Sequence, residues 1–300
     1  MKTATLASIL AIVLTACAPS AAPAPMATSI SPTAIPPDMP APDPLSTGEL
    51  VEVNAGDYSL YVHCFGTGSP IVVMDNALGV EWPYWYTVYS QLPSTVRVCM
   101  YDRSANAHTS QKIVEDLHAL LTGVRLEAPY VLVGHSFGGV NMILFASRYP
   151  EEVAGIVLED SSHPDQGSRG LAALPPESLN ESSDLANLRK QFTQSTSPGN
   201  YFAGIDVAAS FDQVRAIKSL GDIPLVVLTH SPNNFHWGNI PTDVSAKLEQ
   251  ASQDMQKELA VLSSNSTHII ANTSNHTIHR DESQLVVNAI LKLVNAARSK

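Results

Sequence analysis

The sequence predicts an α/β protein, in which helices cover both faces of a mostly parallel β-sheet. Short segments that are apolar almost throughout are typical of strands buried on both faces. Helical patterns lie between these segments, as in a parallel sheet. The strand segments are PIVVM (70–74), VRVCMYD (96–102), YVLVG (130–134) and VAGIVLED (153–160). The helical segments, in which apolar residues recur at helical spacing, are 113–124, 139–150 and 281–298.

Further strands extend this sheet at both ends of the chain. Alternating apolar residues at 49–54 and 58–65 flank a turn of Asn, Gly and Asp, which predicts a β-hairpin. Apolar runs at 223–230 and 266–272 predict two more strands. Between 161 and 221 the pattern breaks, and Ser, Pro, Gly and Asn become frequent. That stretch is too long for a plain connection. We expect an inserted lid over a site there, with a disordered loop as the alternative.

The first 47 residues are predicted to lie outside the folded domain. Residues 1–16 have a lysine, an apolar segment and small residues, as a secretory signal does. Leu14–Cys17 resembles the lipobox of bacterial lipoproteins, which implies a lipid on Cys17 and an anchor at the extracytoplasmic side of a membrane. An ordinary signal peptide or membrane anchor is the alternative. Residues 17–47 are rich in Ala, Pro and Ser, the composition of a semi-extended linker. The domain then covers 48–300.

Composition limits the classes of partner. The formal net charge of −11 argues against nucleic acid, and the 44% of apolar residues suffices for a substantial core. If Cys17 carries a lipid, Cys64 and Cys99 remain as a pair. An exported domain can form a disulfide from them. Two buried free thiols are the other interpretation.

A serine in a glycine-rich turn is the strongest candidate for catalysis. GHSFGG (134–139) has the form G-x-S-x-G and lies directly between a predicted strand and a predicted helix. Gly134 and Gly138 would allow the close approach of strand and helix that such a tight turn demands. The turn would expose the Ser136 hydroxyl as a nucleophile. The amide of Phe137, at the start of the helix, would stabilise an oxyanion.

The serine needs a base, and two histidines follow the last strand. IIANTSNHTIH contains His276 and His279, of which His276 comes first after a small polar run and is preferred. The spacing of the two also suggests a metal site, but no nearby Cys or acidic cluster completes one, and we expect no metal.

From about residue 50 to the end, the chain resembles the alpha/beta-hydrolase superfamily. The matching stretches are the hairpin, IVVMDNALG, VCMYDRS, VLVGHSFGG, YPEEVAGIVLEDSSHPDQ and the histidine loop. The resemblance implies an eight-stranded sheet, Ser136 as nucleophile and His276 as base. It also implies a second oxyanion amide, that of Leu78. The family's sheet order places the second strand beside the fourth, which would bring Cys64 and Cys99 within reach of a disulfide.

The sequence departs from the family at the acid of the triad. The usual place, after the seventh strand, is VVLTHSPNNFHW, which contains no carboxylate. Asp160, at the end of IVLED, is the first choice. The resemblance implies it, because in some superfamily members the acid follows the sixth strand. Asp165 is the next candidate, and Asp243 follows. The order Ser136, Asp160, His276 keeps the family's chain order.

Several other residues have an interpretation from the sequence. Asp102 and Arg103 are expected to form an ion pair or loop hydrogen bonds, and His108 to line the pocket or lie on the surface. The aromatic residues of EWPYWY (81–86) are expected to form an apolar substrate wall or to pack as core.

The sequence therefore predicts an enzyme that hydrolyses carboxylic esters of small molecules through an acyl-enzyme, without a cofactor. Hydrolysis of amide, thioester or carbon–carbon bonds by the same residues is an alternative. A surface binding protein on a catalytically decayed hydrolase fold is the rival from another class.

Overall fold

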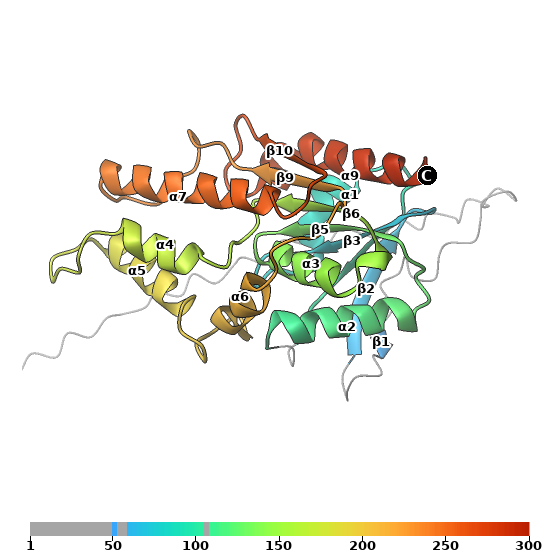
Figure 1. Cartoon of the computed structure of the whole chain (residues 1–300), viewed down its shortest axis with the longest axis horizontal. Helices are drawn as coiled ribbons and strands as arrows, with labels where there is room; N and C mark the ends of the chain where they lie inside the picture. Colours follow the sequence, from blue (N-terminus) through green and yellow to red (C-terminus); the bar gives the residue numbers. More distant parts are fainter. Residues whose placement is uncertain (1–49, 53–58, 105–107, 300) are drawn as a thin grey trace, which may run out of the picture. The chain divides into compact units, whose positions relative to one another are not determined.

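The computed structural model describes residues 50–52, 59–104 and 108–299 (Figure 1). The predicted signal segment, Cys17 and the linker lie outside the described residues. One eight-stranded sheet has the order β1-β2-β4-β3-β5-β6-β9-β10, and a separate two-stranded ribbon pairs β7 with β8. The strands of the large sheet are β1 (Leu50–Glu52), β2 (Ser59–Phe65), β3 (Ile71–Asp75), β4 (Val98–Tyr101), β5 (Tyr130–His135), β6 (Val153–Glu159), β9 (Leu225–Thr229) and β10 (Ser266–Ile270).

The sheet is antiparallel at one edge and parallel elsewhere. β1 and β2 form the predicted antiparallel hairpin. β2 also pairs antiparallel with β4, which joins the hairpin to the rest of the sheet. From β4 to β10 all neighbours are parallel. The predicted fold class is therefore confirmed. Because the strands run in parallel, the loops after β3, β5, β6, β9 and β10 gather at one edge, where functional groups of such sheets lie.

Helices cover both faces of the sheet. The described helices are η2 (Trp82–Trp85), α1 (Tyr86–Tyr89), α2 (Ser110–Gly123), α3 (Phe137–Arg148), η3 (Pro150–Glu152), α4 (Gln166–Ala173), α5 (Ser183–Gln194), α6 (Val207–Arg215), α7 (Thr242–Ala260), α8 (Ile278–Asp281) and α9 (Ser283–Arg298). In Figure 1, α2 and α3 lie on one side of the sheet and α1 and α9 on the other. None of these helices, within the described part of the chain, has the length and apolar character needed to cross a membrane.

Alternate residues of each central strand enter the two halves of the core. In β3, Ile71 and Val73 pack with α2 and α3, while Val72 and Met74 pack with α9. All of these side chains are buried, as expected for strands that are apolar throughout.

A disulfide joins the antiparallel strands β2 and β4. Cys64 and Cys99 are directly opposite each other in the register, with Cα atoms 4.1 Å apart and sulfur atoms 2.08 Å apart. The bond lies on the face covered by α2 and α3. It closes a loop over 35 positions of sequence.

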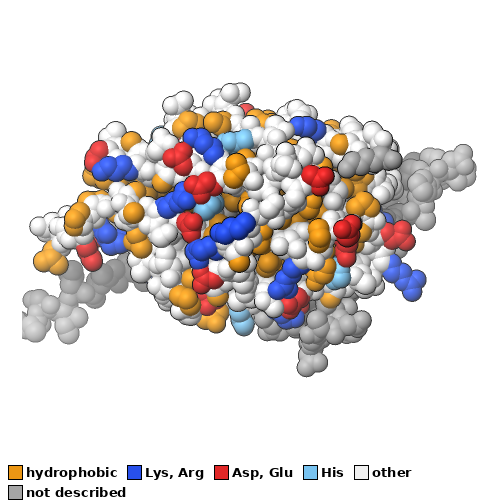
Figure 2. Space-filling model, viewed as in Figure 1, with side chains coloured by type: hydrophobic (Ala, Val, Ile, Leu, Met, Phe, Trp, Pro, Cys, Tyr) orange, Lys and Arg blue, Asp and Glu red, His pale blue; other side chains and the backbone are white. Residues whose placement is uncertain are grey.

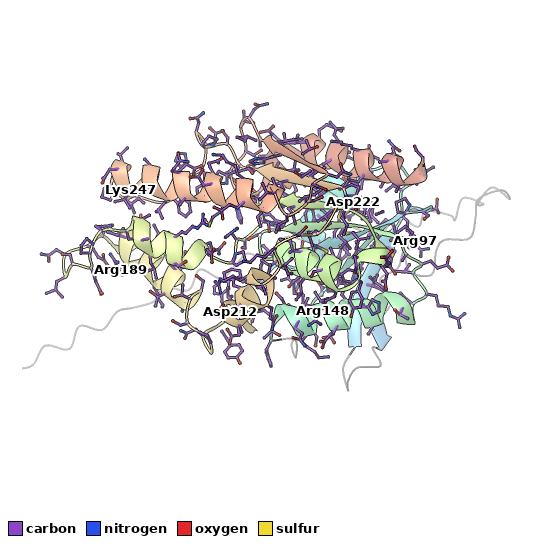
Figure 3. All side chains as sticks on the ribbon, in the orientation of Figure 1. Arg97, Arg148, Arg189, Asp212, Asp222 and Lys247 are labelled. Carbon is purple, nitrogen blue, oxygen red and sulfur yellow. A yellow bond between two sulfur atoms is a disulfide. The ribbon has the colours of Figure 1, made fainter. Side chains whose placement is uncertain are left out.

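The segment 161–221 forms helices α4, α5 and α6 and the ribbon of β7 (Tyr201–Phe202) and β8 (Ile205–Asp206). We call α4, α5 and α7 the cap. They share a separate apolar cluster of Leu174, Leu185, Val244 and Leu248. Figure 1 shows these three helices together beside the carboxyl edge of the sheet. In Figure 3, Arg189 marks α5 and Lys247 marks α7. The cap thus combines the insertion with a helix that follows β9.

Candidate active site

Ser136 occupies a strained turn between β5 and α3. Its backbone has φ 52° and ψ −119°, a conformation that costs a non-glycine residue free energy. A β-carbon at Gly134 would lie 2.5 Å from the backbone nitrogen of Gly139, and one at Gly138 would lie 2.3 Å from the carbonyl oxygen of Asp75. Both glycines are therefore required for the close packing of the turn. Ser136 is partly exposed and lines two cavities.

Arg103 holds the loop that carries Leu78. Its guanidinium forms an ion pair with Asp75 at 2.7 Å and donates to the carbonyls of Asn76 and, at 3.0 Å, Ala77. In a trans peptide the N–H points opposite to the C=O. The amides of Ala77 and Leu78 are therefore directed away from Arg103. Leu78 and Phe137 line one cavity together with Ser136.

Asp160 and His276 meet at the same edge. Asp160 follows β6 with a φ of 40°, and His276 lies in the loop between β10 and α8. His276 Nδ1 donates to Asp160 Oδ2 at 2.6 Å. Burial alone would lower the pKa of His276, but the hydrogen bond and charge of Asp160 outweigh it and raise that pKa above its usual value. With Nδ1 bonded to the carboxylate, Nε2 is the nitrogen that can accept a proton from a hydroxyl.

A second histidine binds the other oxygen of Asp160. His230, the residue after β9, donates to Asp160 Oδ1 from Nδ1 at 2.7 Å and from its backbone amide at 3.2 Å. Burial favours the neutral acid, but the bonds from His230 and His276 keep the pKa of Asp160 well below its usual range. His230 follows β9, the seventh strand of the large sheet in chain order, where the resemblance placed an acid.

The other two candidate acids lie elsewhere. Asp165 accepts from Arg215 Nε at 2.9 Å. Asp243, in the first turn of α7, lies 3.8 Å from Lys247 and its side chain is 73% exposed. The structure joins neither of them to His276 within the residues that it describes.

His279 is completely buried and does not line the cavities around Ser136. It donates from Nδ1 to Glu159 Oε1 at 2.6 Å, while His135 Nε2 donates to the carbonyl of His276 at 2.9 Å. Burial lowers the pKa of His135 to about 4. These two hydrogen bonds link β5 and β6 to the segment that carries His276 and His279.

Residues 135, 159 and 279 also form the group in the described chain that could offer ligands to a metal. One donor atom from each lies within 4.8 Å of the others. A tetrahedral zinc ion with ligands at about 2.1 Å separates its ligand atoms by roughly 3.4 Å. The three donors would have to approach one another to hold such an ion. The sequence interpretation missed this group because Glu159 and His135 come from two neighbouring strands.

Asp102, His108 and Trp85, from the described parts of the 81–86 and 101–110 stretches, make structural contacts. Asp102 accepts from the backbone amide of Trp82 at 3.0 Å, so it and Arg103 have separate partners. His108 is exposed and bonds the carbonyl of Gly204 at 2.9 Å. The expected aromatic substrate wall at 81–86 is wrong for the cavities around Ser136. Trp85 is buried in the core on the α9 face, where the centre of its ring lies 5.0 Å from that of His279.

Two cavities meet at Ser136 and His276. The first, of about 280 Å³, lies under the cap and has a mixed lining, to which Ser162, Gln166 and Gln256 contribute polar side chains. The second, of about 490 Å³, has an apolar lining: Leu78, Phe137, Phe202, Val207 and Phe211. Aromatic side chains of the first cavity are Phe192, Phe235 and Trp237. Most of these residues lie in the insertion or after β9, where the sequence pattern did not predict particular contacts.

The comparisons agree with this fold. A family model described as alpha/beta hydrolase fold matches residues 60–191. The uncharacterized protein YqjL of Bacillus subtilis is 25% identical over 244 residues, which cover 78% of this chain and 87% of that protein. A 2-hydroxy-6-oxo-2,4-heptadienoate hydrolase of Pseudomonas putida is 35% identical over 116 residues, covering 35% of this chain and 42% of that enzyme.

Solved structures share the fold at low identity. A thermophilic esterase from Thermogutta terrifontis superimposes with a TM-score of 0.56 and 18% identity, over 83% of this chain and 98% of that one. The chain therefore has the alpha/beta-hydrolase fold, and its hydrolase relatives support a hydrolase enzyme that acts on a small molecule.

Proposed function

We propose that this protein is a serine hydrolase that cleaves carboxylic esters, with Ser136, His276 and Asp160 as its triad. The observation that carries the proposal is the convergence of three strand ends. A strained turn presents the Ser136 hydroxyl to the cavities that His276 also lines, and the ring of His276 is bonded to Asp160 at 2.6 Å. This is the arrangement that activates a serine, since a base removes its proton while a carboxylate orients that base.

The proposed reaction has two halves. His276 Nε2 takes the proton of Ser136 as Oγ bonds to the acyl carbon, and the amides of Phe137 and Leu78 bind the resulting oxyanion. The carbon–oxygen bond to the alcohol breaks, and His276 returns the proton to the departing alcohol. Water then attacks the acyl-enzyme and loses a proton to His276. The bond to Oγ breaks, and Ser136 recovers its proton as the carboxylic acid leaves.

The larger cavity supports an assignment for the acyl group. Its apolar lining adjoins Leu78 and Phe137, the two proposed oxyanion donors, so an acyl chain bound there would place its carbonyl at Ser136. The smaller cavity, whose lining mixes Ser and Gln with aromatic side chains, would then receive the alcohol. We expect hydrolysis of p-nitrophenyl esters to rise with acyl length until the chain fills the cavity of about 490 Å³, and then to fall.

Labelling by a fluorophosphonate tests the nucleophile directly. The wild-type protein should be labelled, and Ser136→Ala should lose both labelling and at least about 10³-fold of its esterase turnover. Ser162→Ala, which changes a serine in the lining of the same cavities, is the matched control and should still be labelled. Absence of labelling in a folded wild-type protein would instead favour the surface binding protein.

Other bonds could be cleaved by the same residues. The similarity to the heptadienoate hydrolase favours carbon–carbon cleavage as the second candidate. Parallel rates on a p-nitrophenyl ester and on a vinylogous 1,5-diketone would separate the two. A diketone preferred by more than about 100-fold would overturn ester cleavage as the function.

We further propose that the domain is exported and held at the outer side of a bacterial cell membrane by a lipid on Cys17. The short apolar segment and Leu14–Cys17 support this location. Cys17→Ser should move the protein from the membrane fraction to the soluble fraction. Alanine at Cys64 and Cys99 with Cys17 intact is the control and should stay in the membrane fraction. Retention of the Cys17→Ser protein on membranes would contradict lipidation at this site.

A further inference from the structure

The position of the family's usual acid holds a histidine with two carboxylate partners. His230 Nδ1 lies 2.7 Å from Asp160 Oδ1, and Nε2 lies 3.0 Å from Glu249 Oε1 and 3.2 Å from Oε2. Carboxylates only accept hydrogen bonds, so both ring nitrogens must carry protons to make these contacts. With both carboxyl groups ionised, this geometry makes His230 an imidazolium. The side chain of His230 is 2% exposed and that of Asp160 is 5% exposed, so water is largely excluded from the ion pair that they form.

Glu249 is itself fixed by neighbours. Gln253 Nε2 donates to Glu249 Oε1 at 2.8 Å and to the carbonyl of His230 at 3.2 Å. The indole of Trp237 donates to Glu249 Oε2 at 3.4 Å. Helix α7 therefore presents a positioned carboxylate to His230. Because Glu249 balances the charge of His230, the group of Glu249, His230 and Asp160 keeps the single negative charge of an ordinary triad acid.

We propose that His230 is a positioning residue for the triad, which fixes the carboxylate of Asp160 so that Oδ2 faces His276. This inference rests on the proposed function and assigns the part played by the residue after β9. In place of a carboxylate, this position supplies a cation that orients a carboxylate from the neighbouring strand β6. Each oxygen of Asp160 then has its own imidazole, and rotation of the carboxylate would break both bonds.

The charged groups around His230 set the direction of its effect on pH dependence. Asp160 and Glu249 attract its charge, while His276 lies across Asp160 and is repelled, and Glu159 acts on His276 from β6. These attractions outweigh burial and raise the pKa of His230 to about 9. Loss of the cation would remove its repulsion and so raise the pKa of His276.

Two substitutions distinguish the hydrogen bonds that the two ring nitrogens of His230 make. In His230→Asn the side-chain amide can replace Nδ1 and keep the bond to Asp160. In His230→Gln the longer amide reaches the place of Nε2 and keeps only the bond to Glu249. We expect His230→Asn to keep kcat within about fivefold of wild type and His230→Gln to lose about 100-fold, both with KM within about twofold. In the Asn variant the acid limb of the kcat/KM profile should move to higher pH.

The spectrum of the histidine protons provides a readout that needs no turnover. Wild type at pH 7 should show protons on both nitrogens of His230, and a far-downfield signal from His276 Nδ1 that persists in His230→Asn and disappears in His230→Gln. A single proton on wild-type His230, equal kcat losses in the two folded variants, or an acid limb that stays in place would overturn the proposal. If a variant fails to fold, the spectrum of the wild type alone still tests the proposal. A wild type with this spectrum but without esterase activity would refute the proposed function alone.

Discussion

At the scale of single residues, Asp160 is the point where the elements of the site are joined. It accepts hydrogen bonds from His230 on one oxygen and from His276 on the other. We predict that Asp160→Asn lowers turnover by about 10³- to 10⁴-fold, because an amide cannot accept from both rings and cannot stabilise an imidazolium. Steady-state kinetics on a p-nitrophenyl ester measures this. Asp243→Asn is the control, since that side chain is 73% exposed, and a comparable loss there would refute the choice of Asp160.

The sequence sufficed to propose Ser136, Asp160 and His276, because each ends or follows a recognisable apolar strand. It did not suffice for His230. The role of that side chain depends on β6 and β9 being neighbours in the sheet and on Glu249, nineteen positions further along the chain. Arg103 was interpreted only as part of a loop or ion pair. Its contacts with two carbonyls of the Leu78 loop require β3 and β4 to lie side by side.

At the scale of elements, the disulfide joins the antiparallel edge to the parallel part of the sheet. Cys64 and Cys99 close a loop over 35 positions, and disulfides typically contribute about 2–4 kcal/mol of stabilisation, with the chain-entropy model at the upper end for this loop. We predict that the double variant Cys64→Ala and Cys99→Ala loses that free energy of unfolding, measured by urea denaturation. Adding a reductant to wild type should reproduce most of the loss, and the double variant should not respond to it. A reductant effect of equal size on the double variant would show that the disulfide is not its cause.

Element types were predicted best where the apolar pattern was continuous. The hairpin and the central strands coincide with the predicted segments, with ends that differ by one or two residues. Helix α7 was not predicted. Its residues Val244 and Leu248 pack within the apolar cluster of the cap, and Leu259 packs in the core on the α2 and α3 face of the sheet, so its apolar face has two different surroundings. The sequence window after β9 is dominated by polar residues, which obscures that face.

At the scale of the whole molecule, the distribution of surface charge can be followed on one face. Figure 2 shows acidic and basic side chains interspersed on the face that it presents. The net charge of −11 is therefore a weak guide to the charge of that face. Buried histidines should dominate the pH dependence of stability, because their pKa values move furthest within the range in which proteins stay folded.

Two of these histidines act in opposite directions. The pKa of His230 is raised from 6.5 to about 9, so its stabilisation is complete below pH 6.5 and is lost as the pH rises through 9. The pKa of His135 is lowered from 6.5 to about 4, so stability is lost as the pH falls from 6.5 through 4. We predict a maximum of the free energy of unfolding near pH 6.5, with a slope of up to about 1.4 kcal/mol per pH unit on each side.

Calorimetry across pH 4 to 9 measures this profile. His230→Asn should flatten only the alkaline side, since His135 is unchanged in it. An alkaline side that is equally steep in that variant would contradict the assignment of the slope to His230.

The shared apolar cluster of the cap has a consequence for engineering. Because Leu174 and Leu185 come from the insertion while Val244 and Leu248 come from α7, the two stretches are halves of one hydrophobic unit. A chimera that imports only the insertion of a relative would leave the α7 half facing foreign side chains. It would also endanger Glu249, which shares that helix. Recombination to alter substrate range should therefore exchange both stretches at once.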